Sequence, residues 1–485
     1  MKRFFLIIIA VIVLFSSCRK ENYISTDHNQ KLSFSTDTVM FDTVFTSLGS
    51  STHQLKIYND YQDDLKISEI RLMGGEQSRF RINLDGVNGS EFYDKVIPAH
   101  DSLFTFLNVT IDPNDQYTPF VVEDSIMFVT NGNTQMIKLV AWGQNARYIV
   151  ADTHVNGFPA FKVVADSLQT VYWTNELPYV IYGYALIDSW GTLRIQEGTH
   201  VYVHGGGGIW SWIDGQLEIQ GTAENPVIIE GDRLEPFFKN QPGLWDRIWL
   251  MEAREGAGHT INHAIIRNAF IGIQAESTIL YGFDGSHYTD DYLRINNTII
   301  ENHSGMGLYS ALYAIDATNM VIDNCGQYAF AVVEGGEYRI RHSTIGNYWW
   351  QAPRTTASMF LSNYVDQDGE RYEFPFYFEM GNSIVYGALE EELGIALSGV
   401  EVDTTYLIDH CLLKTTEHNN AMPGFNGCIF NEDPLFVDYR NWDLHLSDIL
   451  SPAVGTGDPL IGAQVPYDFD GKSRTGVPDM GAYQY

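Results

Sequence analysis

A short phrase recurs along the second half of the chain and constrains the fold more than any other feature. Each copy opens with Asn or His and continues through a pair of apolar residues, and the clearest copies close with Asn. The clearest copies span residues 263–268, 297–302, 319–324 and 342–347, and looser copies begin at Asn382 and His410. The opening residues are separated by 34 (263 to 297), 22 (297 to 319), 23 (319 to 342), 40 (342 to 382) and 28 (382 to 410) positions.

The shortest separations define a repeat of about 22 residues, and the longer ones are the same unit with insertions. Short apolar runs at this period indicate a β-solenoid, in which each turn buries its apolar face only by stacking on its neighbours. The paired Ile and Val residues favour strands, and the closing Asn tolerates a left-handed bend. We expect Asn268, Asn302, Asn324 and Asn347 to stack in one hydrogen-bonded file. Parallel crossovers should make the coil right-handed.

Earlier echoes of the repeat place the start of the coil. The segments 191–199 and 215–222 resemble each other at a separation of 24 residues, which is again one turn. We therefore expect the β-helix to span residues 190–430, after a transition and N-terminal cap at 147–189. An open solenoid end exposes strand edges, so such a cap has a physical purpose.

The N-terminus has the layout of a bacterial export signal. Lys2 and Arg3 precede an apolar run from Phe4 to Phe15, which is too short to span a bilayer. The position of Cys18 resembles that of the lipid-modified Cys of a lipoprotein, although processing by ordinary signal peptidase stays an alternative. We expect a signal peptide at 1–17, a tether at 18–30 and a palmitate-type anchor on Cys18, holding the chain to the bacterial envelope at the outer membrane.

Residues 31–146 predict a separate all-β domain. Alternating apolar and polar residues, as at 54–59 and 65–72, have the period of half-buried strands, and turn signals such as Asn131-Gly132 separate them. About seven such strands favour an immunoglobulin-like β-sandwich. The order of three segments, 41–45, 56–59 and 141–146, resembles that in the immunoglobulin-like modules of secreted bacterial proteins. This resemblance implies that the domain is a spacer; an independent binding site is the alternative.

The C-terminal segment, residues 431–485, carries the most specific resemblance. The motifs 433–438, 443–446, 451–455, 468–471 and 478–483 follow one another in the order typical of secreted bacterial right-handed parallel β-helix proteins of the pectate-lyase-like superfamily. The resemblance covers about 190–485 and implies that 431–485 cap the coil. It indicates the fold, whereas this architecture hosts lyases, hydrolases and non-catalytic proteins alike.

Charge excludes one class of partner. The formal net charge of -32 should repel nucleic acids and anionic surfaces, and it also opposes a polyanionic glycan. Besides Cys18, the chain has Cys325, Cys411 and Cys428, and three thiols cannot all pair. A Cys411–Cys428 bridge and unpaired packing thiols both stay open.

No complete catalytic motif stands out. Hydrolysis of a polysaccharide needs paired carboxylates, and the nearest pair is Asp290-Asp291 in an insertion. A lyase needs a base and a cation beside a uronate; Arg339 and Arg341 are candidates because alternate residues share one face of a strand. Solvated surface charges are the alternative for all four residues.

Two further features suggest ligands. Asp366 and Asp368, before Gly369, could supply carboxylate oxygens to a calcium ion in this segment. A simple hairpin turn is the alternative explanation of the same residues. Trp349 and Trp350 are adjacent, so both cannot point inward from a strand, and flat indole faces stack well on sugar rings. We expect at least one of them to be exposed and to contact a ligand.

Three functions remain open. The first is a lipid-anchored envelope protein whose β-helix binds a polysaccharide or cell-surface glycan through insertions at about 280–292 and 348–378. The second is a polysaccharide lyase or glycoside hydrolase. The third is a structural or adhesive surface protein. We expect no cofactor unless calcium binds.

Overall fold

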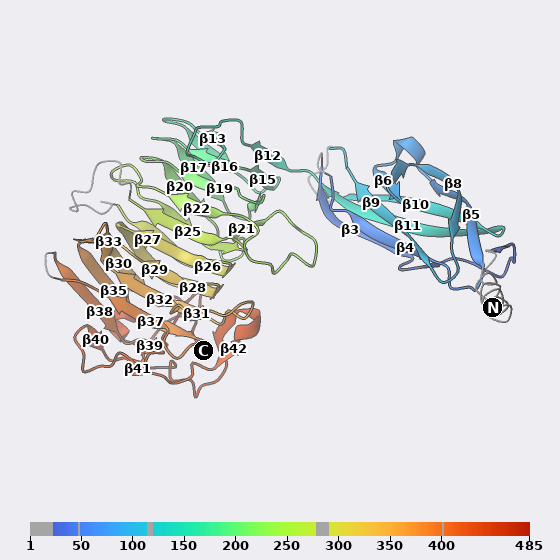
Figure 1. The fold of residues 1–485 in the computed structure, drawn as a ribbon. Helices are drawn as coiled ribbons and strands as arrows, with labels where there is room; N and C mark the ends of the chain where they lie inside the picture. Colours follow the sequence, from blue (N-terminus) through green and yellow to red (C-terminus); the bar gives the residue numbers. More distant parts are fainter. Residues whose placement is uncertain (1–22, 47–48, 114–119, 278–290, 400–401) are drawn as a thin grey trace, which may run out of the picture. The chain divides into compact units, whose positions relative to one another are not determined.

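The computed structural model describes residues 23–46, 49–113, 120–277, 291–399 and 402–485. Contacts divide the chain into two compact units, Met1–Asn145 and Ala146–Tyr485. Each unit is nearly all β (Figure 1). No helix in the described ranges is long and apolar enough to cross a membrane. The predicted signal peptide and Cys18 lie outside these ranges.

The N-terminal unit is a β-sandwich of two sheets. One sheet has the order β1-β5-β10-β11-β3, with β8 beside β5, and the other has the order β2-β4-β9-β6-β7. Their bounds are β1 (Ile24–Ser25), β2 (Ser33–Phe34), β3 (Thr38–Phe45), β4 (His53–Tyr58), β5 (Asp64–Leu72), η1 (Gly75–Gln77), β6 (Phe80–Leu84), β7 (Val87–Gly89), β8 (Glu91–Ile97), β9 (Ser102–Val109), β10 (Phe120–Thr130) and β11 (Asn133–Gln144). Alternate residues of these strands, such as Leu55, Ile57 and Phe128, form a buried core. The relationship to immunoglobulin-like modules stays a prediction.

The expected tether at 18–30 differs from the structure at its C-terminal end. Residues Ile24 and Ser25 pair in parallel with Asp64 and Leu65 of β5. Asn133 and Gln135 of β11 also donate side-chain hydrogen bonds to His28 O and Leu32 O, at 2.7 and 2.9 Å. These contacts make residues 24–30 part of the sandwich.

The C-terminal unit is a parallel β-helix, which confirms the predicted architecture. The strands form three parallel ladders, called A, B and C in chain order within a turn, and all turns except those at the two ends contribute a strand to each (Figure 1). Ladder A contains β14 (Thr170–Trp173), β17 (Thr192–Gln196), β20 (Gln216–Gln220), β23 (Thr260–Asn262), the first part of β26 (Leu293–His303), the first part of β28 (Tyr313–Cys325), β30 (Gly336–Arg341), β35 (Phe376–Gly381), β38 (Thr404–Asp409) and β40 (Phe425–Asn426). Ladder B contains β12 (Arg147–Val150), β15 (Tyr179–Tyr182), β18 (His200–Val203), β21 (Val227–Gly231), β24 (Ala264–Arg267), the second parts of β26 and β28, β31 (Thr344–Asn347), β36 (Ile384–Gly387), β39 (Leu412–Leu413) and β41 (Ile429–Phe430).

Ladder C is a separate sheet. It contains β13 (Phe161–Ala165), β16 (Tyr184–Ile187), β19 (Gly208–Ser211), β22 (Arg247–Leu250), β25 (Ile271–Glu276), β27 (Met306–Ala311), β29 (Phe330–Val332), β32 (Met359–Ser362) and β37 (Leu393–Ala396). Inward-pointing side chains of all three ladders, such as Ile273, Ile295 and Ile322, form one continuous core. Each such side chain contributes about 1.5–3 kcal/mol through removal from water.

The coil begins earlier than predicted. Strands β12 to β16, at residues 147–187, pair in register with the strands of the next turns, for example Tyr179 with Val201 and Leu186 with Trp210. The expected transition and cap at 147–189 is therefore the first turns of the coil itself. The weaker repeat there concealed this because it lacks the Asn phrases.

The Asn phrases form two corners of each turn. The closing residues Asn268, Asn302 and Asn324 have positive φ, between the B and C ladders. Their side chains form the predicted file: Asn302 Nδ2 donates to Asn268 Oδ1 at 2.8 Å, and Asn324 Nδ2 to Asn302 Oδ1 at 2.7 Å. Asn347 departs from the file, because the chain enters an insertion there and its Nδ2 donates to Gln327 O.

The opening residues of the phrases form the corner between ladders A and B. All six have φ between 46° and 51°, a conformation that Asn adopts more readily than most residues. They are His263, Asn297, Asn319, His342, Asn382 and His410. The left-handed bend was predicted only at the closing Asn, so this second corner is a feature that the sequence did not reveal.

The C-terminal segment covers the side of the coil, whereas the sequence analysis expected a cap. It contains β42 (Phe436–Asp438), η3 (Tyr439–Asn441), β43 (Asp443–Leu446) and α2 (Pro459–Gly462). Leu444, Met480 and Tyr483 bury the outward side chains of ladder B, including Val321 and Ile384. Ala482 N donates to Thr344 Oγ1 at 3.0 Å, and Gly481 N to Asn382 O at 2.8 Å. The segment therefore covers the outer face of ladder B.

Insertions border ladder C at both edges. Residues 232–246 and 348–358 connect ladder B to ladder C, whereas residues 277–292 and 363–375 connect ladder C to ladder A. Connections from A to B are much shorter in these turns, often a single left-handed residue. Of the two insertion regions predicted to bind ligand, 348–378 borders ladder C, whereas residues 280–290 of the other lie outside the described residues.

Candidate functional site

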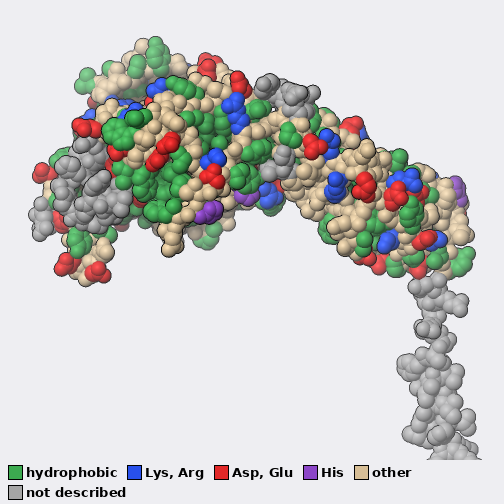
Figure 2. Space-filling model, turned by 90° about the horizontal axis from the view of Figure 1, so that it is seen from above, with side chains coloured by type: hydrophobic (Ala, Val, Ile, Leu, Met, Phe, Trp, Pro, Cys, Tyr) green, Lys and Arg blue, Asp and Glu red, His purple; other side chains and the backbone are tan. Residues whose placement is uncertain are grey.

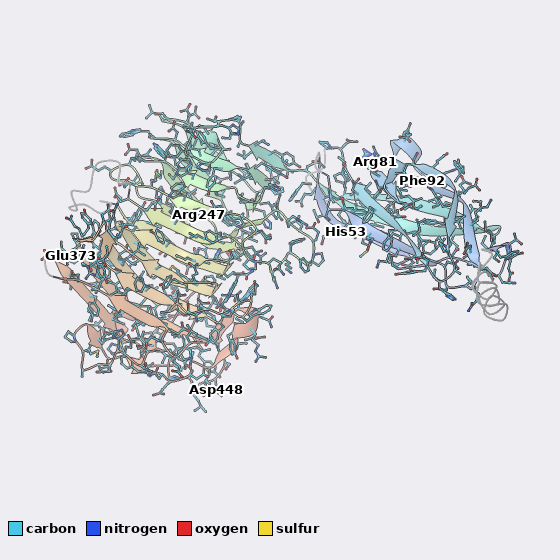
Figure 3. The ribbon with its side chains drawn as sticks, viewed as in Figure 1. His53, Arg81, Phe92, Arg247, Glu373 and Asp448 are labelled. Carbon is cyan, nitrogen blue, oxygen red and sulfur yellow. The ribbon has the colours of Figure 1, made fainter. Side chains whose placement is uncertain are left out.

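The outer face of ladder C combines aromatic and carboxylate side chains. Outward positions on successive strands align in register from Leu186 through Trp210, Trp249 and Gln274 to Tyr309. These side chains point outward because their neighbours, such as Ile248 and Ile273, point into the core. Figure 3 labels Arg247, which opens the Trp249 strand.

Indole rings stack on this face. Trp210 and Trp249 lie parallel, with centroids 4.9 Å apart and an interplanar angle of 10°. Trp212 meets Trp210 edge-on at 5.1 Å, and Phe158 stacks on Trp210 at 5.7 Å. Trp210 is buried, whereas Trp249 and Trp212 are half-buried and Phe158 is exposed. The stack therefore presents flat apolar rings to solvent on a rigid base.

A carboxylate lies beside the exposed indole. Trp249 Nε1 donates to Glu276 Oε1 at 2.7 Å, and Gln274 Nε2 donates to Glu276 Oε2 at 2.9 Å. Arg247 in turn donates to Gln274 Oε1 and forms an ion pair with Asp246 at 2.9 Å. The network fixes Glu276 and gives the face several hydrogen-bonding groups next to aromatic rings.

A second carboxyl group, that of Glu334, lies two strands away along ladder C, two residues after β29 ends. Burial raises the pKa of Glu334, and the charge of Glu276 raises it further. The same surroundings raise the pKa of Tyr309 to about 12, through burial and then the charges of Glu334 and Glu276. A carboxyl group with a raised pKa near a second carboxyl group is an arrangement that general acid–base chemistry uses. Sequence reasoning missed Glu276 and Glu334 because they lie on different turns.

The insertion that carries the predicted ligand-binding tryptophans is fixed by a buried ion pair. Arg354 NH2 lies 2.6 Å from Glu392 Oε1, and both side chains are almost fully buried. Glu392 also accepts hydrogen bonds from Ser358 N at 2.9 Å and Leu389 N at 2.7 Å. Trp350 is 71% exposed at this edge of ladder C and Trp349 is half-buried. At least one of the two tryptophans is thus exposed.

Of the two acidic catalytic candidates, the structure describes only Asp291, which precedes the ladder A part of β26. Asp290 is outside the described residues, and Asp291 accepts a hydrogen bond from Gly256 N. This contact joins the end of one insertion to the preceding turn. Asp291 therefore has a structural partner, and its catalytic role stays a prediction.

The arginine candidates lie on ladder A. Arg339 and Arg341 point outward from β30 on either side of the buried Ile340, as predicted. Arg339 pairs with Glu337 at 2.7 Å, and Arg341 pairs with Asp316. They line a cavity of about 360 Å³ together with Glu379 and Asp409. The structure thus gives each arginine a carboxylate partner and places both on a different ladder from the aromatic face.

Basic side chains are dispersed elsewhere too. On the face shown in Figure 2, Lys and Arg lie singly or in small groups beside Asp and Glu. Within the β-helix, Arg194 pairs with Glu218 and Arg267 with Glu230, at 2.7 and 2.8 Å. Among the described residues seen on that face, this pattern gives no extended basic surface for a polyanion.

The calcium candidates occupy a hairpin. Asp366 lies on β33 (Tyr364–Gln367), which pairs with β34 (Glu370–Glu373), and Asp368 forms the turn with φ of 53°. Both Asp366 oxygens accept from Arg371, at 2.8 and 2.9 Å. The hairpin projects at the edge where Figure 3 labels Glu373. The alternative of a hairpin turn explains this geometry, and the calcium hypothesis remains untested.

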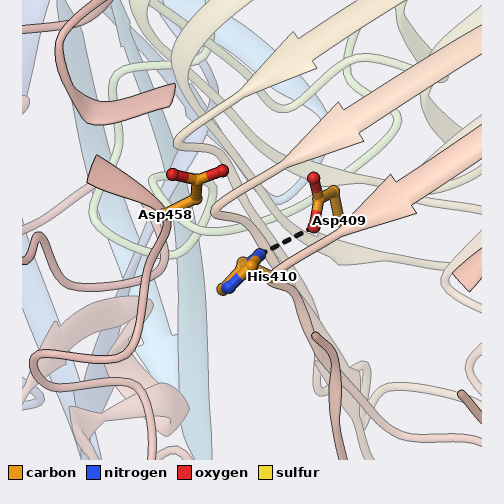
Figure 4. Close-up of side chains that lie close together, drawn as sticks. All are labelled: Asp409, His410 and Asp458. Atoms are coloured by element: carbon orange, nitrogen blue, oxygen red, sulfur yellow. Dashed lines mark hydrogen bonds and ion pairs between the residues drawn. The ribbon is translucent and has the colours of Figure 1, made fainter. Parts of the chain in front are cut away.

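One other group has metal-ligand chemistry. The ligand atoms of Asp409, His410 and Asp458 lie within 4.8 Å of one another (Figure 4). His410 Nδ1 lies 2.7 Å from Asp409 Oδ1, and Asp458 accepts from Leu460 N at the start of α2. Asn382 holds Asp458 through both its main-chain groups. These bonds attach the C-terminal segment to the corner between ladders A and B.

The chain has only limited similarity to known proteins. No protein-family model matches the chain, and no curated protein matches it. Among solved structures, the catalytic unit of a GH87 α-1,3-glucanase from Streptomyces thermodiastaticus is 10% identical, with 78% of this chain and 75% of that chain covered and a TM-score of 0.24. A family 123 glycoside hydrolase from Clostridium perfringens is 8% identical, with 30% of each chain covered and a TM-score of 0.18. A PapD-like domain of human CEP192 is 10% identical, with 24% of this chain and 85% of that chain covered and a TM-score of 0.17.

Proposed function

We propose that the β-helix binds a polysaccharide along the outer face of ladder C. The observation that carries this proposal is the half-buried Trp249, whose indole is stacked on Trp210 and bonded to Glu276. A sugar ring offers an apolar face to such an indole and hydroxyl groups to the adjacent carboxylate and amide. Rigid aromatic rings provide this contact area at low cost in conformational entropy.

The charge of the chain favours a neutral glycan. The net charge of -32 opposes a polyanionic partner, and the face itself carries the carboxyl groups of Glu276 and Glu334 and, among the described residues, no basic residue paired with either. The insertion 348–358, which carries Trp350, and the insertion 363–375 lie at opposite edges of ladder C and extend the surface available to a chain of sugars.

Retention on immobilised neutral polysaccharides tests the proposal. We expect Trp249→Ala to weaken retention about tenfold, equivalent to about 1.4 kcal/mol. The matched control is Phe104→Ala, which removes a 40%-exposed aromatic ring from the sandwich. Equal retention of the two variants on every glycan would contradict binding at ladder C and favour a structural or adhesive role.

A hydrolase is the second candidate. The raised pKa of Glu334 suits a general acid, and the neighbouring Glu276 would serve as the second carboxylate. If the protein releases reducing ends from a glycan, Glu334→Gln should lower the rate by about 10²–10⁴-fold. Arg339→Ala, on ladder A, should leave the rate unchanged; the opposite pattern would indicate lyase chemistry at the arginines.

Anchoring remains part of the proposal. We infer that Cys18 is lipid-modified and that the protein is held at the bacterial outer membrane, because the apolar run and Cys18 match a lipoprotein signal. Cys18→Ser should move the protein from the detergent-soluble membrane fraction to the soluble fraction. Unchanged fractionation would contradict a lipid anchor.

A further inference from the structure

Two cysteines meet at the last turns of the coil. Leu412 of β39 is in register with Ile429 of β41, so the preceding residues Cys411 and Cys428 occupy equivalent positions on adjacent turns. Ile429 N donates to Cys411 O at 2.9 Å, which closes the ladder at this point. Neighbouring parallel strands lie about 4.8 Å apart. That separation falls within the range of about 4.4–6.8 Å between the Cα atoms of a disulfide.

Both side chains point into the same core. Cys411 is fully buried, Cys428 is 6% exposed, and both belong to the cluster of inward-pointing residues. Their outward neighbours Leu412 and Ile429 instead pack under the C-terminal segment. Both thiols are free in the structure; Cys411 Sγ donates to Asp409 O and Cys428 Sγ donates to Ile408 O, each at 3.3 Å.

The two thiols differ in reactivity. Burial raises the pKa of Cys411 well above its ordinary value. The neighbouring Cys411 thiol lowers the pKa of Cys428, which is also the less buried of the two. Since the thiolate is the nucleophile in thiol–disulfide exchange, Cys428 is the sulfur that reacts first.

We propose that Cys411 and Cys428 form a disulfide that joins the last two turns of the coil when the chain meets an oxidising disulfide. The Cys428 thiolate attacks one sulfur of the external disulfide and displaces the first thiol. The Cys411 thiolate then attacks Cys428 Sγ in the mixed disulfide and displaces the second thiol. The protein loses two protons and two electrons, and the external disulfide is reduced to two thiols.

Cys325 provides an internal control. It is also fully buried in the core, but the residue in register on the preceding turn is His303. No other described cysteine aligns with it, since the remaining two are Cys411 and Cys428. Tryptic cleavage separates the three thiols into peptides 295–339, 372–414 and 415–440.

The experiment uses the full chain, refolded from urea in detergent with a mixture of oxidised and reduced glutathione and, in parallel, with dithiothreitol. Free thiols are then alkylated in denaturant, and the tryptic peptides are identified by mass spectrometry. We expect the oxidised sample to lose alkylation at Cys411 and Cys428 together and to contain peptide 372–414 linked to 415–440. Alkylation of peptide 295–339 should be unchanged.

Single substitutions separate pairing from general reactivity. Cys325→Ser should keep the linked peptides, whereas Cys411→Ser should abolish them and leave Cys428 alkylated or joined to glutathione. The proposal is overturned by full alkylation of all three peptides in the oxidised sample. A link to peptide 295–339, or a glutathione adduct on wild-type Cys428 without the internal link, would overturn it as well.

Discussion

Ladders B and C belong to the same turns of the coil, yet their outer faces differ. Over its later turns, ladder B carries apolar outward residues such as Val321 and Ile384, which the C-terminal segment buries. Ladder C presents the half-buried Trp249 and Glu276, with insertions at its edges. One face is thus closed by the chain itself, and the other keeps polar and aromatic groups within reach of solvent.

The different exposure of the two outer faces distinguishes buried ionisable groups with a structural role from groups that a ligand could reach. Asp323, on ladder B, is almost fully buried, and burial raises its pKa well above the ordinary value. Glu334, on the ladder C side, also has a raised pKa but is only half-buried. A perturbed pKa marks a candidate functional site only where a ligand can reach the group. The comparison therefore favours ladder C.

The largest expected effect concerns the buried ion pair that fixes one edge of ladder C. Glu392→Ala leaves the Arg354 guanidinium buried without its carboxylate, which should lower the free energy of unfolding by about 3–5 kcal/mol. Urea denaturation measures the change. Glu390→Ala, at an exposed position two residues away, is the control. Similar losses in both variants would show that the pair does not hold this edge.

The second-largest expected effect is the loss of stability caused by a cavity between the C-terminal segment and ladder B. Leu444 is 2% exposed and packs against Gly346 of β31. Leu444→Ala should cost about 2–5 kcal/mol in the same measurement, because a buried leucine is removed and a cavity remains. Leu460→Ala, at a position that is 77% exposed, should change stability by less than about 0.5 kcal/mol. If the variants behave alike, the C-terminal segment does not seal ladder B.

Glu301 predicts a pH dependence of stability. Burial on ladder B raises its folded-state pKa to about 7 from 4.5, although Arg267 partly opposes the shift. Between about pH 4.5 and 7 the native state binds more protons than the unfolded state, so stability should fall as pH rises through this range. The decline should amount to on the order of 2–3 kcal/mol.

Glu301→Gln isolates this contribution. The difference in unfolding free energy between variant and wild type should grow from pH 4.5 to 7 and then level off. A difference that is independent of pH would show that Glu301 ionises freely, and that the cover of ladder B does not desolvate it.

The smallest expected effect is at the exposed edge of ladder C. Trp350→Ala should leave unfolding within about 0.5 kcal/mol of wild type, because 71% of the side chain is exposed. Retention on a bound glycan should weaken by about threefold to tenfold if the insertion contributes to the surface, which is about 1 kcal/mol. Unchanged retention would restrict the site to the strands around Trp249.

Local patterns in the sequence predicted much of the coil correctly. The Asn phrases gave its parallel stacking and the hydrogen-bonded file of Asn268, Asn302 and Asn324, because each amide depends only on its own repeat and the next. The Asn phrases did not predict the first turns of the coil. There, Tyr179 and Leu186 pair in register with the next turn although the sequence lacks the phrase. Arg339 and Arg341 were correctly placed on one face, but their carboxylate partners Glu337 and Asp316 were not foreseen.

The sequence by itself therefore determined the repeat, the corner at the closing Asn and the alternation of inward and outward residues, since these follow from periodicity and from the conformations that Asn and Ile favour. Only the tertiary structure decided which outer face stays open. Val321, which the C-terminal segment covers, and Trp249, which stays half-buried, are both outward positions in the alternating pattern of a strand. The pattern alone does not distinguish a covered position from an open one. Covering depends on contacts between residues more than a hundred positions apart, such as Thr344 with Ala482, and no local pattern encodes such a contact.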